Sequence, residues 1–398
     1  MGFFIFEFLF STWRMILFTD CYFDDVWSLI YLLKVGKKID CIVITGNGWN
    51  NIGEAFVLIT YIVKWFGKNI PVMPGSTHAL RDYKNGKNSC DRVYHPLYKG
   101  TVPLDALFNI SYMYSFVTWL PPVELEQSLY SENFTENIMD IVHTLDSFDI
   151  LILGSATDPA IMLYLMTDEE IKKINRVFCL GSNVDIKNNV FSIRRSEKST
   201  FNVYSDPDAS KFLLSILKEK VYWIIGDVAE SVQFNIDEIG ALVEKNPTPE
   251  CLWLYIASQI GGNFEKSAPV GQLPNHLIMW DIIVTILFLF PEYISKQTIE
   301  CVDIDVNSFM YCQKSDHDTK IVKVYSNDLA DINTSDYYGT PTHIVHAMDT
   351  QKVLDKFYEI LQSQENTALV DLMMPLGNYQ YEKITTPKDY ENKKLLYS

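Results

Sequence analysis

Apolar residues along this chain fall into short continuous runs and segments of helical periodicity, and the two patterns alternate. The runs have the length and composition of buried strands, which we expect at residues 15–19, 41–45, 70–73, 149–153, 176–180, 221–225 and about 298–304. After the first run, apolar residues recur at helical spacing from Val26 to Leu33, so Asp24 should open a helix. This alternation is typical of an α/β protein with an open, mainly parallel β-sheet flanked by helices.

The middle of the chain reads as one domain. Between residues 15 and 365 no stretch has the composition of a linker, and no internal repeat is found. We therefore expect a single domain at residues 15–372. Residues 1–14 form a short apolar segment, either a weak signal or an extension, and residues 373–398 have the polar, Lys-rich composition of a poorly packed tail.

The apolar start of the chain is relevant to whether the protein is secreted or cytoplasmic. It is interrupted by Glu7 and lacks the basic residues that normally begin a secretory signal. Three sequons, at Asn109, Asn133 and Asn333, are what a secreted glycoprotein would carry. We expect a cytoplasmic protein, with secretion as the alternative. No apolar run approaches the roughly 18 residues of a membrane span, so no membrane partner is expected.

Composition and charge narrow the class of ligand. Hydrophobic residues make up 48% of the 398 residues, which is enough for a large core and excludes disorder as the main state. The net charge of −17 argues against nucleic acid as a partner, because phosphate binding needs clustered Lys and Arg. The acidic balance suits a metal ion or a neutral small molecule. The seven cysteines include no C-x-x-C pair, so neither a disulfide framework nor a zinc site is indicated.

Small and acidic residues collect where the expected strands end. They occur at residues 20–25, 46–49, 154–158, 181–183 and 226–227. In open parallel sheets the ligand crevice lies beyond the carboxyl ends of the strands. We therefore expect the functional site at this edge of the sheet.

Three carboxylates stand out at the end of the first strand. Asp20 ends the strand, and Asp24 and Asp25 begin the following helix, so the turn between them can bring all three together. Crowded carboxylates raise one another's pKa unless a cation neutralises them. Their oxygen ligands suit Ca²⁺ or Mg²⁺. The alternative is structural, with Asp24 capping the helix and Asp25 favouring its dipole.

The pattern Asp20-x-x-x-Asp24-Asp25 resembles the amino-terminal signature of the nucleoside hydrolases, the inosine-uridine preferring family of N-ribohydrolases. Further segments resemble this family in the same order, at residues 70–75 (P-V-x-x-G), 153–158 (G-P-L-T-N), 200–209 (E-F-N-x-x-x-D-P-x-A) and 280–281 (H-D or W-D). Trp280-Asp281 matches the W-D form of the purine-specific branch, so the resemblance favours that branch. It implies a Rossmann-like core.

By this resemblance one Ca²⁺ would be held by Asp20, Asp25, the main-chain carbonyl of Thr157 and Asp281. Asp20 would be the general base for a metal-activated water. The implied reaction is hydrolysis of the N-glycosidic bond of ribonucleosides, with purines favoured, to free base and ribose with inversion. Such an enzyme is a purine nucleosidase that serves nucleoside catabolism and purine salvage. By analogy, a homo-oligomer, either a dimer or a tetramer, is expected.

The resemblance also implies contacts to the nucleoside. Asp24, Asn47 and Asn202 would hydrogen-bond the ribose hydroxyls. Trp280 stands where the pyrimidine-accepting branch has a histidine acid. An indole cannot protonate the leaving base, but it can stack on a purine and favour protonation of its imidazole ring.

The sugar-binding residues depart from the family pattern. Thr200 replaces a glutamate that would contact ribose, Arg194 stands where an asparagine would reach the sugar, and Phe18 replaces an aspartate. Either ribose is held more loosely at Thr200, or Arg194 and Arg195 accept a negative group near the 5′ end. These changes leave a second interpretation open, in which an impaired family member binds a nucleoside without efficient hydrolysis.

Other chemistries are poorly supported. Gly46-x-Gly48 follows a strand as in dinucleotide-binding proteins, but the third glycine is misplaced. An aspartyl phosphatase would want a second aspartate where Tyr22 stands. His343-x-x-His346 lacks the glutamate of a metalloprotease helix, and we expect both histidines to face solvent.

Overall fold

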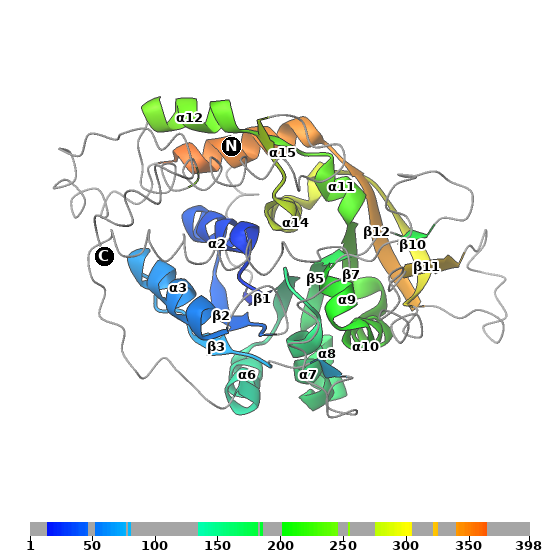
Figure 1. Ribbon diagram of the computed structural model, residues 1–398. Coiled ribbons are helices and arrows are strands. Elements are labelled where there is room, and N and C mark those ends of the chain that lie inside the picture. Colours follow the sequence, from blue (N-terminus) through cyan, green and yellow to red (C-terminus); the bar gives the residue numbers. More distant parts are fainter. Residues whose placement is uncertain are drawn as a thin grey trace, which may run out of the picture.

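A mixed β-sheet with helices on both faces organises the described part of the chain (Figure 1). The computed structural model describes residues 14–46, 52–76, 79–80, 134–181, 184–185, 201–245, 254, 275–304, 321–324 and 340–363. Over these residues the large sheet has ten strands in the order β3-β2-β1-β4-β5-β7-β12-β10-β11-β6.

The first six strands in this order, together with β12, form a parallel block. Its strands are β1 (Met15–Thr19), β2 (Ile39–Ile44), β3 (Val72–Pro74), β4 (Phe148–Ile152), β5 (Ile174–Gly181), β7 (Val221–Ile225) and β12 (Thr340–Met348). Strands β1 and β4 are buried along their whole length, as expected of strands covered on both faces. The predicted α/β class with a mainly parallel sheet is confirmed. The predicted bounds match for β1 and β7 and differ at the ends of the other predicted strands.

Beyond β12, the sheet contains two antiparallel pairs and one parallel pair, and the sequence predicted little of this part. Strand β10 (Ile294–Ile304) runs antiparallel to both β12 and β11 (Ile321–Val324), and β6 (Val184–Asp185) pairs with β11. A separate pair joins β8 (Phe234–Asn235) to β9 (His276–Leu277). The expectation that His343 and His346 face solvent is wrong. Both lie on β12, where His343 stacks on Tyr222 and the side chain of His346 is 8% exposed.

Helices cover both faces of the parallel block (Figure 1). One face carries α2 (Phe23–Val35), α3 (Ile52–Trp65), α14 (Trp280–Leu289) and α15 (Thr350–Gln362). The other carries α6 (Phe134–Thr144), α7 (Thr157–Leu165), α8 (Asp168–Lys172) and α10 (Pro207–Leu217). The remaining short elements are α9 (Phe201–Ser205), α11 (Gly226–Glu230), α12 (Ile236–Lys245), η4 (Lys218–Lys220) and η5 (Pro291–Tyr293).

Helix α14 is central to the packing because it is apolar on nearly every side. After Trp280, all of its residues are buried, and it contacts α2, α15 and β5. A helix without a polar face is stable in water only when neighbours surround it. Among the described residues, no helix combines the length and the apolar character needed to cross a membrane.

The strand order reverses between β1 and β4, and this is where an open sheet forms its crevice. The chain leaves β1 toward β2 on one side, whereas it leaves β4 toward β5 on the other. The two strand ends approach closely, since a Cβ on Gly154 would lie 2.8 Å from the backbone nitrogen of Asp20. Only glycine allows this approach without displacing backbone.

The close approach at Gly154 predicts a local cost of any side chain. Gly154→Ala should destabilise the protein by about 1–3 kcal/mol, because the added methyl pushes the ends of β1 and β4 apart. Chemical denaturation measures this. Gly53→Ala, on the exposed start of α3, is the matched control and should be neutral or slightly stabilising. Equal stabilities of the two variants would contradict the close approach.

Candidate metal and active site

Three buried carboxylates meet beside the place where the strand order reverses between β1 and β4, which we call the switch point. Asp24 and Asp25 lie in the first turn of α2, and Asp281 lies in the first turn of α14. Their ligand atoms all lie within 4.8 Å of one another. The packing of α14 against α2 brings Asp281 next to Asp24, which is 257 positions away in the sequence, and to Asp25. We call this group the carboxylate cluster.

The start of α2 holds the Asp25 carboxylate in a defined orientation. The Thr19 hydroxyl donates to its Oδ1 at 2.5 Å, and the Tyr22 backbone N–H donates to its Oδ2 at 3.1 Å. The tight turn between strand and helix places Cys21 at φ 58°, in the left-handed region. Both oxygens of Asp25 therefore have donors before any ligand binds.

Asp24 and Asp281 contact each other directly. The backbone N–H of Asp281 donates to Oδ2 of Asp24 at 3.1 Å. Oδ1 of Asp281 is buried and has no hydrogen-bond partner among the described residues. Each carboxylate also lies at a helix N-terminus, where the dipole favours negative charge. The cluster thus offers an oriented oxygen that no described residue satisfies.

Burial makes the cluster costly to ionise. Burial, followed by the charge of Asp25, raises the pKa of Asp24 to about 7. Burial also raises the pKa of Asp25, although the Thr19 hydroxyl opposes this. For Asp281, burial and then the charges of Asp24, Asp25 and Asp20 raise the pKa well above its usual value. An all-oxygen set that cannot ionise fully by itself fits a hard divalent cation.

Asp20 lies beside the cluster rather than within the group of three. It is buried, and its Oδ1 accepts from the Tyr22 backbone N–H at 3.4 Å. Its charge raises the pKa of Asp281, which places it close to that carboxylate. The sequence analysis expected Asp20, Asp25 and Asp281 as carboxylate ligands and Asp24 as a ribose contact. In the structure, Asp24 joins Asp25 and Asp281 in the cluster.

The end of β4 supplies the opposite side of the switch point. Thr157 begins α7 and is fully buried, and its hydroxyl donates to Oδ2 of Asp206 at 2.8 Å. Asn202 lies on α9, and its side-chain amide donates to the Leu153 carbonyl at 2.7 Å. The turn after β4 is therefore tied to the segment that contains the D-P-x-A motif.

Trp280 precedes Asp281 at the start of α14 and is partly exposed. Its indole Nε1 donates to Oε1 of Glu230, on α11, at 3.3 Å. This hydrogen bond directs the indole toward α11, one position before the Asp281 of the carboxylate cluster. The expected ligand residues Asn47, Thr200 and Arg194 lie outside the described residues, as do Arg195, residues 1–13 and residues 373–398.

Sequence reasoning missed several residues that build this site. Thr19 directly precedes Asp20, but only the turn geometry reveals that its hydroxyl serves Asp25. Asp206 could have been assigned as a helix N-cap, since a proline follows it and it caps α10. Its contact with Thr157 and the contact of Glu230 with Trp280 join distant segments and have no local signal.

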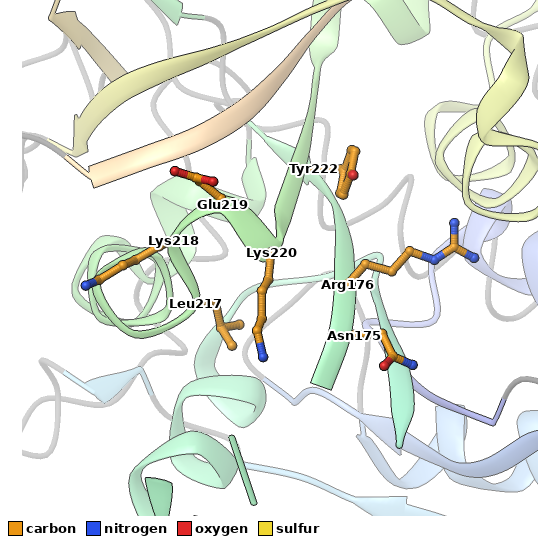
Figure 2. Close-up of a pocket in the computed structure, with 7 residues that line it drawn as sticks. All are labelled: Asn175, Arg176, Leu217, Lys218, Glu219, Lys220 and Tyr222. Carbon is orange, nitrogen blue, oxygen red and sulfur yellow. The ribbon is translucent and has the colours of Figure 1, made fainter. Parts of the chain in front are cut away.

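A hollow of about 550 Å³ lies at the amino ends of β5 and β7, away from the cluster (Figure 2). Its basic side chains, Arg176, Lys218 and Lys220, point in different directions. The Lys220 ammonium donates to the Ile174 carbonyl at 2.7 Å, and Arg176 pairs with Asp149 at 3.1 Å. Because two of the three cations serve structural contacts, the carboxylate cluster is the better candidate site.

Comparison with solved structures shows the same fold in several enzymes. A plant nucleoside hydrolase has a TM-score of 0.67 and 16% identity, covering 88% of this chain and 99% of its own. An inosine-uridine preferring nucleoside hydrolase from Bacillus anthracis has a TM-score of 0.60 and 16% identity, with the same coverages. A purine-preferring ribonucleoside hydrolase from Gardnerella vaginalis has a TM-score of 0.63 and 16% identity, covering 88% and 98%.

Comparison at the level of sequence identifies the family. A search of curated proteins gave no match. The family model for inosine-uridine preferring nucleoside hydrolase matches residues 15–355, which include both strand ends and the whole carboxylate cluster. The chain therefore belongs to the inosine-uridine preferring nucleoside hydrolase family, whose members are hydrolases.

Proposed function

We propose that this protein is a Ca²⁺-dependent N-ribohydrolase that cleaves ribonucleosides, with purines favoured, to free base and ribose. The observation that carries the proposal is the buried carboxylate cluster at the switch point, with one oxygen of Asp281 lacking a hydrogen-bond partner among the described residues. Family membership supports the reaction class. The all-oxygen donor set supports Ca²⁺, which accepts six to eight such ligands.

The residues proposed to hold Ca²⁺ are Asp20, Asp25, Asp281 and the Thr157 main-chain carbonyl, with Asp24 close enough to assist. When bound, the ion neutralises the crowded carboxylates and makes a nearby water more acidic. Asp25 is held for this role by its two donors. The pre-oriented donors mean that little side-chain reordering accompanies binding.

Asp20 is the proposed general base. Asp20 takes a proton from the water that attacks the anomeric carbon. At the same time the N-glycosidic bond breaks, and its electron pair leaves with the nucleobase. The sugar passes through an oxocarbenium-like state without a covalent intermediate. The position of Asp20 at the tip of β1, buried and next to the cluster, supports this role.

Trp280 is the proposed contact of the leaving base. Its indole begins α14 next to Asp281 and is oriented by Glu230. A flat aromatic surface gains more from stacking on a purine than on the smaller pyrimidine ring. This supports the preference for purine nucleosides.

Replacement of Asp20, the proposed general base, gives the most direct test of the mechanism. Asp20→Asn should lower kcat for inosine or guanosine by at least about a thousandfold, since both proton acceptance and a ligand charge are lost. Base release in the presence of Ca²⁺ measures this. Asp140→Asn, the same change on the exposed face of α6, should keep wild-type activity.

Two outcomes would change the interpretation. Unchanged turnover by the Asp20→Asn variant would remove its assignment as the base. A wild-type protein that binds Ca²⁺ and nucleosides but releases no base would favour the impaired, nucleoside-binding interpretation, to which the departures at Thr200 and Arg194 point.

Calcium affinity should depend on pH with a defined sign. The pKa of Asp24 in the metal-free protein is raised to about 7, so below pH 7 a proton occupies this carboxyl, which lies close enough to assist in binding the ion. Affinity should therefore fall as the pH drops from 8 to 6, by up to about tenfold per pH unit for each proton displaced. Calorimetric titration with Ca²⁺ measures it. Asp24→Asn should weaken binding and reduce this dependence without removing it, because the pKa values of Asp25 and Asp281 are raised as well. An equal affinity of the wild type at pH 6 and 8 would contradict the argument.

Base preference should depend on the indole. Trp280→Ala should lower kcat/KM for inosine and guanosine by about tenfold or more, and lower it less for uridine, because stacking on the larger ring is lost. Steady-state kinetics with the three nucleosides measures the ratio. Trp65→Ala, in α3 on the same face of the sheet, is the control for a general loss of packing. A uniform loss for all three substrates would reject Trp280 as a determinant of preference.

A further inference from the structure

Asp206 makes more hydrogen bonds than its place in the chain requires. It is fully buried and caps α10, where its Oδ1 accepts the backbone N–H of Ala209 at 3.0 Å. Its Oδ2 accepts two further donors, the Thr157 hydroxyl at 2.8 Å and the Leu80 backbone N–H at 2.7 Å. One oxygen serves the helix cap, whereas the other joins segments that are 49 and 126 positions away.

Asn202, four positions earlier, holds the same turn at its other end. Its side-chain amide donates to the Leu153 carbonyl at 2.7 Å, while Asp206 holds Thr157. Within the turn, the hydroxyls of Ser155 and Thr157 are 3.1 Å apart. Residues 153–157, which join β4 to α7 beside Asp20, are thus fastened at both ends by side chains from one segment, residues 202–206.

The chain that follows β3 is fastened at the same place. The Ser76 backbone N–H donates to Oδ1 of Asp158 at 2.7 Å, directly after Thr157, and the Leu80 N–H donates to Asp206. Both aspartates are fully buried. The ends of β3 and β4 and the start of α10 therefore meet at the Asp206 carboxylate.

We propose that Asp206 is a positioning residue that fixes Thr157, and with it the main-chain ligand at the end of β4, through the second oxygen of its carboxylate. The inference rests on the proposed function, because it assigns a role toward the same metal site. Only an ionised carboxylate presents acceptors on both sides. Asparagine caps helices as well as aspartate does, but with its amide oxygen on Ala209 its amide nitrogen would meet the Leu80 backbone N–H as a second donor and would reverse the direction of the hydrogen bond with the Thr157 hydroxyl.

The test compares the same substitution at two helix caps. Asp206→Asn preserves size and capping ability but removes the acceptor for Thr157 or Leu80. Asp349→Asn is the matched control, because Asp349 caps α15 through the Lys352 backbone N–H at 3.2 Å, and α15 carries none of the proposed ligands. The readouts are calorimetric titration with Ca²⁺, kcat and KM for inosine, and hydrogen exchange of the Leu80 amide.

Asp206→Asn should weaken Ca²⁺ binding and lower kcat/KM by about 10–100-fold, the usual effect of losing a residue that orients a metal ligand. Asp349→Asn should lower only the unfolding temperature. Thr157→Val keeps the main-chain carbonyl and removes the hydroxyl, so it should reproduce part of the effect. The double variant should be no worse than Asp206→Asn alone, because both changes break the same hydrogen bond.

Failure of this inference and failure of the proposed function give different results. If the wild type binds Ca²⁺ and cleaves nucleosides while Asp206→Asn behaves like Asp349→Asn, the positioning role is overturned and the function stands. If the wild type neither binds Ca²⁺ nor releases base, the proposed function falls and the metal role of Asp206 falls with it. In that case, faster hydrogen exchange of the Leu80 amide in Asp206→Asn would still show that Asp206 holds the chain after β3. Unchanged exchange would reject this contact.

Discussion

The mutual burial of Asp24, Asp25 and Asp281 is the constraint on which the rest of this structure depends. A buried acid elsewhere has a cation beside it, since Asp149 pairs with Arg176 at 3.1 Å. The cluster has no such cation among the described residues, and burial raises the pKa of all three carboxyls. Crowded acids of this kind lower stability unless a cation joins them, so the fold retains them at the expense of metal-free stability.

Helix packing, one glycine and one buried aspartate hold these acids and the neighbouring strand ends in place. Helices α2 and α14 direct their N-termini at the cluster, and the almost entirely apolar body of α14 packs against both β5 and α2. On the other side of the switch point, Gly154 lets the end of β4 approach Asp20, and Asp206 fastens the turn that follows. Strand ends, helix caps and one glycine thus converge on a single point.

Much of the parallel half of the fold was predictable because its signals are local. A continuous apolar run such as β1 or β7 identifies a strand covered on both faces, and its bounds follow from where the run stops. The antiparallel half was not predictable in the same way. Strand β12 mixes threonine, proline and histidine with apolar residues, and it becomes a strand because β7 and β10 pair with it.

By itself, the sequence determined the α/β class, because continuous apolar runs are a local signal. Residue type and strand-end position also predicted an acidic site with Asp20, Asp24 and Asp25 at one edge of the sheet, whereas Asp281 was predicted only from the resemblance of Trp280-Asp281 to the family pattern. The tertiary structure alone decided that Asp24 rather than Asp20 groups with Asp25 and Asp281. It also decided that Asp206 serves Thr157 and that Glu230 orients Trp280. These contacts depend on how α14 and α10 pack, and the separation of residues along the chain does not encode the angle at which two helices meet.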